Sequence, residues 1–194
     1  MRFARFTADN AAMLLIDHQV GTMGWVKSIS FEEMKRNALM LAQAARILKM
    51  PVVLTSSMEE YAQGPLLSEL ESILPAEFAA RVKRFGIVNA MDDENFAAAV
   101  KATGRRKLII AGVTNDVCTV YPALSLVGDG FEVQVVADAG GSPTSMADDI
   151  ALRRMAQAGV TLTSTNQLIA ELAGSWVTPE GGELIQVMMP ALQA

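Results

Sequence analysis

The sequence predicts an α/β fold, in which a six-stranded parallel sheet is covered by helices on both faces as a three-layer α/β/α sandwich. Short apolar runs alternate with longer segments whose apolar residues recur at helical spacing. The runs are wholly or mostly apolar, as strands buried on both faces are. Gly, Pro and polar turn residues separate the two kinds of segment. Because crossovers between parallel strands are right-handed, we expect the strand order 3-2-1-4-5-6.

The first half of the chain predicts three strands and the helices between them. The first apolar run ends at Asp17, which puts a carboxylate at the carboxyl end of a strand. Ser30 and Glu33 have the spacing of a capping box, and Pro51 stops the helix that they begin. The expected elements are a strand at 12–16, a helix from 30 to about 49, a strand at 52–54, a short helix at 66–74 and a weak strand at 79–83.

The second half predicts three more strands and four helices. Asp92 or Asp93 caps the first of these helices, and Gly104 ends it. The run 108–111 is wholly apolar, and Asp116 is placed to cap the helix that follows it. The expected elements are a helix ending at 104, a strand at 108–111, a helix from 116, a strand at 133–136, a helix at about 145–158, a strand at 160–163 and a helix from 166 to about 173.

Length and composition fit one domain with a large core. Of the 194 residues, 51% are hydrophobic and 19% are charged, which leaves apolar surface for other subunits to cover. The net charge of −5 argues against nucleic acid as a partner. No apolar run reaches the roughly 18 residues of a membrane span, and no secretory leader precedes Asp9. A single cysteine excludes an internal disulfide, so we expect a cytoplasmic protein.

That cysteine, Cys118, lies where reactive groups are common in this kind of fold. It follows the strand at 108–111, and open α/β sheets bind ligands beyond the carboxyl ends of their strands. It also falls in the first turn of the next helix, whose dipole favours a thiolate. The alternative is a buried and inert side chain, which is the more usual state of a lone cysteine.

Two other chemical types stand at predicted strand ends. Asp17 follows the first strand, and the adjacent cations Lys83 and Arg84 follow the third. With Cys118 they make a nucleophilic site, in which Asp17 takes the thiol proton and a cation holds the thiolate. Backbone N–H groups at the helix start could form an oxyanion hole. Taken singly, Asp17 could equally be a loop cap and Arg84 a solvated charge.

Several short segments form a specific set when they are taken together. They are 14–19, 64–66, 84–86, 89–90, 102–104, 108–113, Cys118, 122–125 and 138–139. This set resembles the isochorismatase-like cysteine hydrolase superfamily, and most closely its YcaC-type branch. The resemblance covers roughly residues 10–175. It implies a Rossmann-like hydrolase domain over 1–175, followed by an extension at 176–194 that packs on the core or on a neighbouring subunit.

The resemblance also implies a catalytic triad. Cys118 would be the nucleophile and Asp17 the general base. The third member is a cation after the third strand, and the spacing to Gly86 points to Arg84, with Lys83 as the alternative. Because two adjacent residues of a strand face opposite sides, only one of these cations can serve. An Arg would act by its charge alone, since it does not give up its proton.

The superfamily usually has a cis non-proline peptide just before the cysteine turn, here Thr114–Asn115. Thr114, Asn115 and Cys118 would then supply the oxyanion hole, with Asn115 donating its backbone N–H. Many members have a Thr where this chain has Asn115, and Thr119 replaces a commoner apolar residue. Both departures leave the triad intact and bear on substrate preference.

The function implied is hydrolysis of a C–N bond in a small amide or ureido compound, through a thioester at Cys118. The pocket walls are expected to include Gln19, Trp25, Tyr61, Phe85 and residues around Asn115. One alternative is a catalytically silent member that binds a small ligand or serves as an oligomeric scaffold. Another is an isochorismatase-type vinyl-ether hydrolase, which is disfavoured because the chain has no clear anion clamp.

No cofactor or metal is expected. The place after the second strand where related nicotinamidases carry metal-binding His residues reads 56–60 Ser-Ser-Met-Glu-Glu here. The only histidine, His18, has no second His or Cys nearby to share a metal, so a neutral, hydrogen-bonded His18 is the favoured interpretation. Phosphate-binding glycine motifs are missing as well. The resemblance implies a homo-oligomer larger than a dimer, such as an octamer built from tetrameric rings.

Overall fold

The computed structural model describes residues 5–193 and confirms the predicted sheet. Its six strands are all parallel and follow the order β3-β2-β1-β4-β5-β6. The strands are β1 (Ala11–Ile16), β2 (Val52–Ser57), β3 (Val82–Arg84), β4 (Lys107–Gly112), β5 (Glu132–Val136) and β6 (Thr161–Thr163). The central pair, β1 and β4, is buried almost throughout, which explains why those two runs are so apolar.

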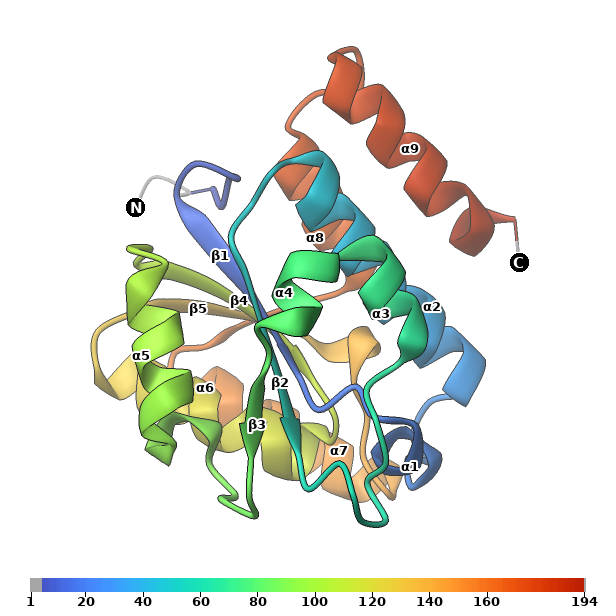
Figure 1. Ribbon diagram of the computed structural model, residues 1–194. Helices are drawn as coiled ribbons and strands as arrows, with labels where there is room; N and C mark the ends of the chain where they lie inside the picture. The colour runs from blue at the N-terminus through green and yellow to red at the C-terminus, as the bar shows by residue number, and fades with distance from the viewer. Residues whose placement is uncertain (1–4, 194) are drawn as a thin grey trace.

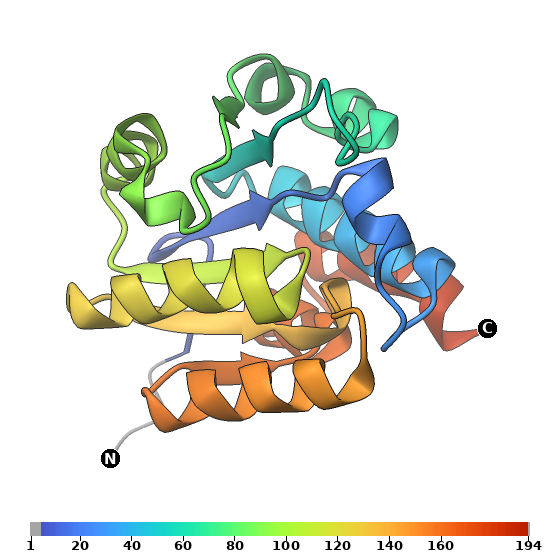
Figure 2. The ribbon, with the colours of Figure 1, turned by 90° about the horizontal axis from the view of Figure 1, so that it is seen from below.

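Helices cover both faces of the sheet. On one face lie α2 (Phe31–Ile47), α3 (Ser68–Ile73), α8 (Thr165–Ala173) and α9 (Pro179–Leu192). On the other lie α5 (Glu94–Ala102), α6 (Val120–Gly128) and α7 (Ser145–Gln157). Figures 1 and 2 show these two layers with the sheet between them. The shorter elements are α1 (Val20–Gly24), α4 (Pro75–Ala79) and the turns η1 (Ala90–Asp92), η2 (Asn115–Thr119) and η3 (Ala137–Ala139).

The core is divided by the sheet into two apolar clusters. Alternate residues of β1 point to opposite sides: Met13 and Leu15 pack with α2 and α8, whereas Leu14 and Ile16 pack with α5 and α6. Phe96 of α5 is fully buried among the second set. Because both faces are filled in this way, the only surface that the strands leave open for a ligand is the edge formed by their carboxyl ends.

The third strand departs from its predicted bounds. The short helix expected at 66–74 is present as α3, which ends before Pro75. The strand expected at 79–83 runs instead from Val82 to Arg84, and an unpredicted helix, α4, begins at Pro75. Pro is well tolerated in the first turn of a helix, where its missing N–H has no partner to lose. The strand consequently contains both Lys83 and Arg84 and orients them to opposite sides.

The C-terminal extension folds onto its own chain. Helix α9 lies against α2 and α8, and Leu184, Val187 and Met188 are buried in the first apolar cluster. Leu192 near its end remains exposed. None of the helices in the described part of the chain has the length and apolar character needed to cross a membrane.

Candidate active site

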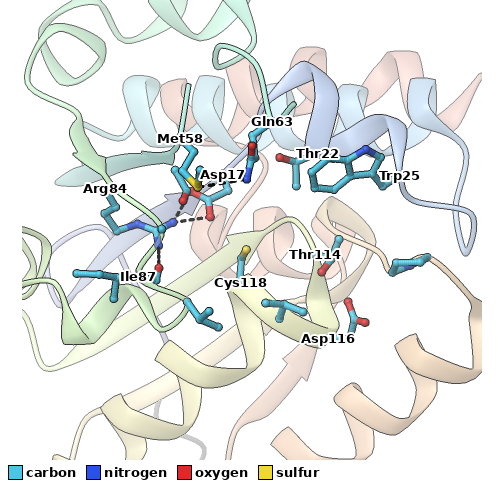
Figure 3. A pocket seen from close by; sticks show the side chains of 15 residues that line it. Asp17, Thr22, Trp25, Met58, Gln63, Arg84, Ile87, Thr114, Asp116 and Cys118 are labelled. Atoms are coloured by element: carbon cyan, nitrogen blue, oxygen red, sulfur yellow. Dashed lines mark hydrogen bonds and ion pairs between the residues drawn. The ribbon is translucent and has the colours of Figure 1, made fainter. Parts of the chain in front are cut away.

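Three strand ends bring Asp17, Arg84 and Cys118 to one cavity. Asp17 follows β1, Arg84 is the last residue of β3, and Cys118 lies in the turn η2 after β4. The register pairs Ile16 with both Thr55 and Gly112, so these ends share one edge of the sheet. All three side chains line a cavity of about 290 Å³, seen in Figure 3.

Asp17 is fixed by its backbone. Its φ of 57° lies in the left-handed region, a conformation that costs a non-glycine residue about 1–2 kcal/mol and that Asp tolerates better than most. Its N–H donates to the Thr55 carbonyl at 3.0 Å, and its carbonyl accepts from the Gln19 N–H at 2.7 Å. The chain turns sharply there, and the carboxylate is directed toward Arg84 and Cys118 (Figure 3).

Arg84 is held by acceptors for four of its five N–H groups. Its Nε donates to Thr55 Oγ1 at 3.0 Å, Nη1 to the Ile87 carbonyl at 2.7 Å, and Nη2 to both carboxylate oxygens of Asp17. Its side chain is only 1% exposed. Lys83 points the other way, is 58% exposed and pairs with Glu59 at 3.1 Å. Of the two candidate cations, the cavity therefore contains Arg84.

The turn that carries Cys118 is wider than an α-helical turn. The Thr119 N–H donates to the Thr114 carbonyl at 3.0 Å, and the Val120 N–H donates to Asn115, so η2 is π-helical. The predicted cap at Asp116 is wrong, because Thr114 occupies the N-cap and no side chain caps the turn. Helix α6 begins only at Val120, so Cys118 precedes the helix instead of lying in its first turn.

The cis peptide lies one bond before the predicted one. It joins Val113 and Thr114, because Asn115 is already the first residue of the turn. The Asn115 N–H is engaged with the Gly141 carbonyl at 2.7 Å, and its side-chain amide donates to Ala137 and Asp148. The expected oxyanion donor at Asn115 is thus occupied by structural bonds. The Thr114 N–H, by contrast, is directed at the Cys118 sulfur.

Burial governs the protonation of the pair formed by Cys118 and Asp17. It raises the pKa of Cys118, and the nearby Asp17 carboxylate raises it further, because both disfavour a thiolate. The resting thiol is therefore protonated and shares the cavity with the Asp17 carboxylate. The thiolate expected from the helix dipole is wrong for this reason. Burial also raises the pKa of Asp17, although the Arg84 guanidinium opposes that shift.

The cavity walls differ from those predicted. Trp25 lines the cavity as expected. Gln19 does not, because its side-chain amide accepts from the Ser57 N–H and donates to the carbonyls of Ser57 and Gly64. Tyr61 and Phe85 lie outside as an exposed edge-to-face pair with centroids 6.1 Å apart. Val117, close to Asn115, lines the cavity as expected, whereas the apolar lining residues Met58, Ile87, Val88 and Pro143 were missed.

Asp116, next to Asn115, also lines the cavity, whereas the polar lining residues Thr22, Ser57 and Gln63 were missed. Most of the missed residues lie within a few positions after a strand end. The rule that ligands bind beyond the carboxyl ends of the strands, which identified Asp17, therefore identifies the loops that contain them. It does not say which side chains of a loop turn inward. That choice depends on the path of each loop.

His18 is fully buried beside the site. Its Nε2–H donates to the Ala139 carbonyl at 2.8 Å, which leaves Nδ1 unprotonated. Burial lowers its pKa to about 4, so the ring is neutral near pH 7. Within residues 5–193, no three His, Cys, Asp or Glu side chains gather closely enough to hold a metal ion.

Comparisons with known proteins agree on one family. A family model described as the isochorismatase domain matches residues 11–167. The probable hydrolase YcaC of Escherichia coli K12 is 40% identical over 174 residues, which cover 90% of this chain and 83% of that protein.

Two solved YcaC structures superpose closely. One, from Pseudomonas aeruginosa with hexane-2,5-diol and covalent acrylamide, has a TM-score of 0.90 at 38% identity and covers 98% of this chain and 95% of its own. The other, from Escherichia coli, is described as an octameric hydrolase of unknown specificity. It has a TM-score of 0.91 at 36% identity and covers 100% of this chain and 95% of its own.

Proposed function

The chain belongs to the isochorismatase-like hydrolase family, and on that premise we propose that it cleaves the C–N bond of a small amide or ureido compound through a thioester at Cys118. The observation that carries the proposal is the shared cavity, which Cys118 lines together with the Asp17 carboxylate that Arg84 holds. A thiol, a base and a fixed cation form a complete set for nucleophilic acyl transfer.

In the first step, Cys118 Sγ attacks the carbonyl carbon while Asp17 takes the thiol proton. The raised pKa of Asp17 makes it a better base than an ordinary carboxylate, since its proton affinity is closer to that of the thiol. The C–N bond then breaks, and Asp17 returns the proton to the leaving nitrogen. In the second step, Asp17 removes a proton from water, and the resulting hydroxide attacks the thioester carbon. The C–S bond breaks, and Asp17 returns its proton to the departing sulfur, which gives the acid and the free thiol.

Backbone donors stabilise the oxyanion in this proposal. The Thr114 N–H faces the Cys118 sulfur. It can therefore donate to the negatively charged oxygen that forms on the carbonyl carbon when the sulfur attacks. We assign the Cys118 N–H as the second donor. Arg84 keeps its proton throughout, because a guanidinium does not titrate in this range, and it acts by fixing Asp17 and by its charge.

Two properties of relatives support the proposal. Acrylamide, an electrophilic alkene, is bound covalently in the Pseudomonas aeruginosa structure, so that protein has a reactive nucleophile. The Escherichia coli relative is described as octameric, and we propose a similar closed assembly here, in which neighbouring chains cover exposed apolar residues such as Trp176 and Leu192. Light scattering tests the assembly, and a monomer at micromolar concentration would contradict it.

The test of function is a panel of small amides and ureas, assayed by mass spectrometry for loss of ammonia or amine. We expect wild-type turnover of at least one member and no turnover by Cys118→Ala. Asp17→Asn should lower the rate about 10²–10⁴-fold, the range typical of a general base. Unfolding curves confirm that the variants remain folded. Undiminished hydrolysis by Cys118→Ala, or no substrate in a broad panel, would overturn the proposal.

A further inference from the structure

We propose that the substrate has no negative charge: the cavity selects a neutral or cationic small amide and rejects carboxylates of the same shape. This inference rests on the proposed function and names the substrate class for the same site. It is drawn from the charges that line the cavity and from what each charge already binds.

The only cation among the lining residues is Arg84, and its guanidinium is already bound to other groups of the protein. Its three nitrogens donate to Thr55, Ile87 and Asp17, and its charge is balanced by the Asp17 carboxylate. These acceptors take four of the five guanidinium N–H groups, so a substrate carboxylate could form a bidentate pair with Arg84 only by displacing one of them. The guanidinium therefore does not serve as a clamp for a substrate carboxylate.

The second carboxylate in the lining, Asp116, is uncompensated. Within the described part of the chain it forms no ion pair, and its Oδ1 is buried without a hydrogen-bond donor. Figure 3 shows it beside Thr114, at the rim of the cavity that contains Cys118. The lining thus carries two carboxylates against one guanidinium, which leaves a net negative charge.

Charges behind the wall add to this field. Asp148 of α7 accepts from Ser142 Oγ at 2.7 Å and from the Asn115 amide at 3.1 Å, and both donors are neutral. Lys27, two residues after Trp25, donates to the Gly24 carbonyl at 3.3 Å and is not part of the lining. A carboxylate in the cavity would meet repulsion from Asp116 and Asp148 without a cation to offset it.

The remaining lining suits a small molecule with an amide and an apolar portion. Trp25, Ile87, Val88 and Val117 form a largely apolar wall. Thr22 is almost fully buried, and its hydroxyl, which has no partner in residues 5–193, is directed toward the cavity in Figure 3. A volume of about 290 Å³ is at the lower end of ligand pockets, so the substrate has few heavy atoms.

The test compares two reagents of nearly equal shape, neutral iodoacetamide and anionic iodoacetate. Mass spectrometry follows alkylation of Cys118, the only cysteine of the chain. Each rate is divided by the rate with 2-mercaptoethanol, which removes the intrinsic difference between the reagents. We expect the normalised rate for iodoacetamide to exceed that for iodoacetate by about tenfold or more, an order of magnitude that one uncompensated charge within several ångströms provides. Asp116→Asn should reduce this ratio severalfold, and Asp116→Lys should bring it below one.

Asp129→Asn is the matched control, because it removes the same charge from an exposed residue that lies outside the cavity lining. It should leave the ratio unchanged. If neither reagent reaches the thiol, butyramide and butyrate are compared by saturation-transfer NMR, with the same order expected. Equal or faster modification by iodoacetate, equal binding of the NMR pair, or a ratio insensitive to Asp116 overturns the inference. Turnover of amides can persist in that case. The experiments therefore distinguish failure of the charge preference from failure of the proposed function.

Discussion

Asp17 and Glu59 each face an arginine of the segment 81–84, on opposite sides of the strand β3. Asp17 meets Arg84 inside the molecule, where both side chains are 1% exposed. Glu59 meets Arg81 at 2.7 Å near the surface, with its own side chain 10% exposed. Both pairs join a carboxylate to a guanidinium, and the outer carboxylate also contacts Lys83, so the pairs differ in burial and in the number of donors.

The two carboxylates titrate in opposite directions. Hydrogen bonds from Arg81, Ser56 and Lys83 lower the pKa of Glu59 to about 2. Burial raises the pKa of Asp17, even though Arg84 opposes the shift. A carboxylate with an arginine partner is therefore either a stable anion or a usable base, and the depth of burial decides which. The Glu59–Arg81 pair links the loop after β2 to the segment that begins β3, whereas the Asp17–Arg84 pair lies beside the Cys118 thiol.

The largest effect is expected from removing Arg84. Arg84→Met leaves Asp17 buried without its cation, and breaking a buried pair in this way typically costs about 3–5 kcal/mol of unfolding free energy. Arg81→Met is the matched control in the outer pair and should cost about 1 kcal/mol. Urea unfolding at pH 7.5 measures both. Equal losses of unfolding free energy in the two variants would contradict a special role for burial. Partial recovery of stability in the double variant Asp17→Asn/Arg84→Met would show that the loss comes from the unpaired Asp17 carboxylate.

A smaller effect is expected from acid on the outer pair. The folded-state pKa of Glu59, about 2, lies below its ordinary 4.5, so its stabilising contribution is complete above pH 4.5 and is lost as pH falls from 4.5 to 2. Glu59→Gln should lower the unfolding free energy by about 1–2 kcal/mol at pH 7, after allowance for solvent screening. The difference between the variant and the wild type should shrink below pH 4.5. A difference that stays constant from pH 7 to pH 2.5 would show that Glu59 is not the titrating group.

The smallest effect is expected from Lys83→Ala. An exposed ion pair contributes about 0–1 kcal/mol, and Lys83 points away from the cavity. Its substitution should leave both stability and amide turnover close to those of the wild type. Turnover reduced more than tenfold would restore Lys83 as the catalytic cation. The same amide panel and the same urea titration serve for this variant.

The fold and the position of the three strand ends at one edge of the sheet were predictable, because both follow from patterns within short segments of the sequence. Apolar runs such as 108–111 predict buried parallel strands, and parallel strands bring their carboxyl ends together, so Asp17 and Cys118 could be placed near each other from positions a hundred residues apart. The assignment of opposite faces to Lys83 and Arg84 needed only the two-residue period of a strand.

The details of the site were not predictable because they depend on contacts between distant segments. The protonated state of Cys118 follows from burial under several loops and from the charge of Asp17, neither of which the local sequence reports. Gln19 looked available for a substrate, but its amide is taken up by Ser57 and Gly64. Asn115 looked like an oxyanion donor, but Gly141 accepts its N–H. In each case a partner far along the chain occupies the group.

The wide turn at Asn115–Thr119 has a consequence for how this site could be lost over evolutionary time. A π-helical turn accommodates one residue more than an α-helical turn, and each helical residue rotates the chain by about 100°. Deleting one codon from this turn would let α6 start as a regular helix, with its core-facing side chains in place and the cysteine rotated away from Asp17. A duplicated gene could thus keep the fold and lose the catalytic arrangement through a single deletion.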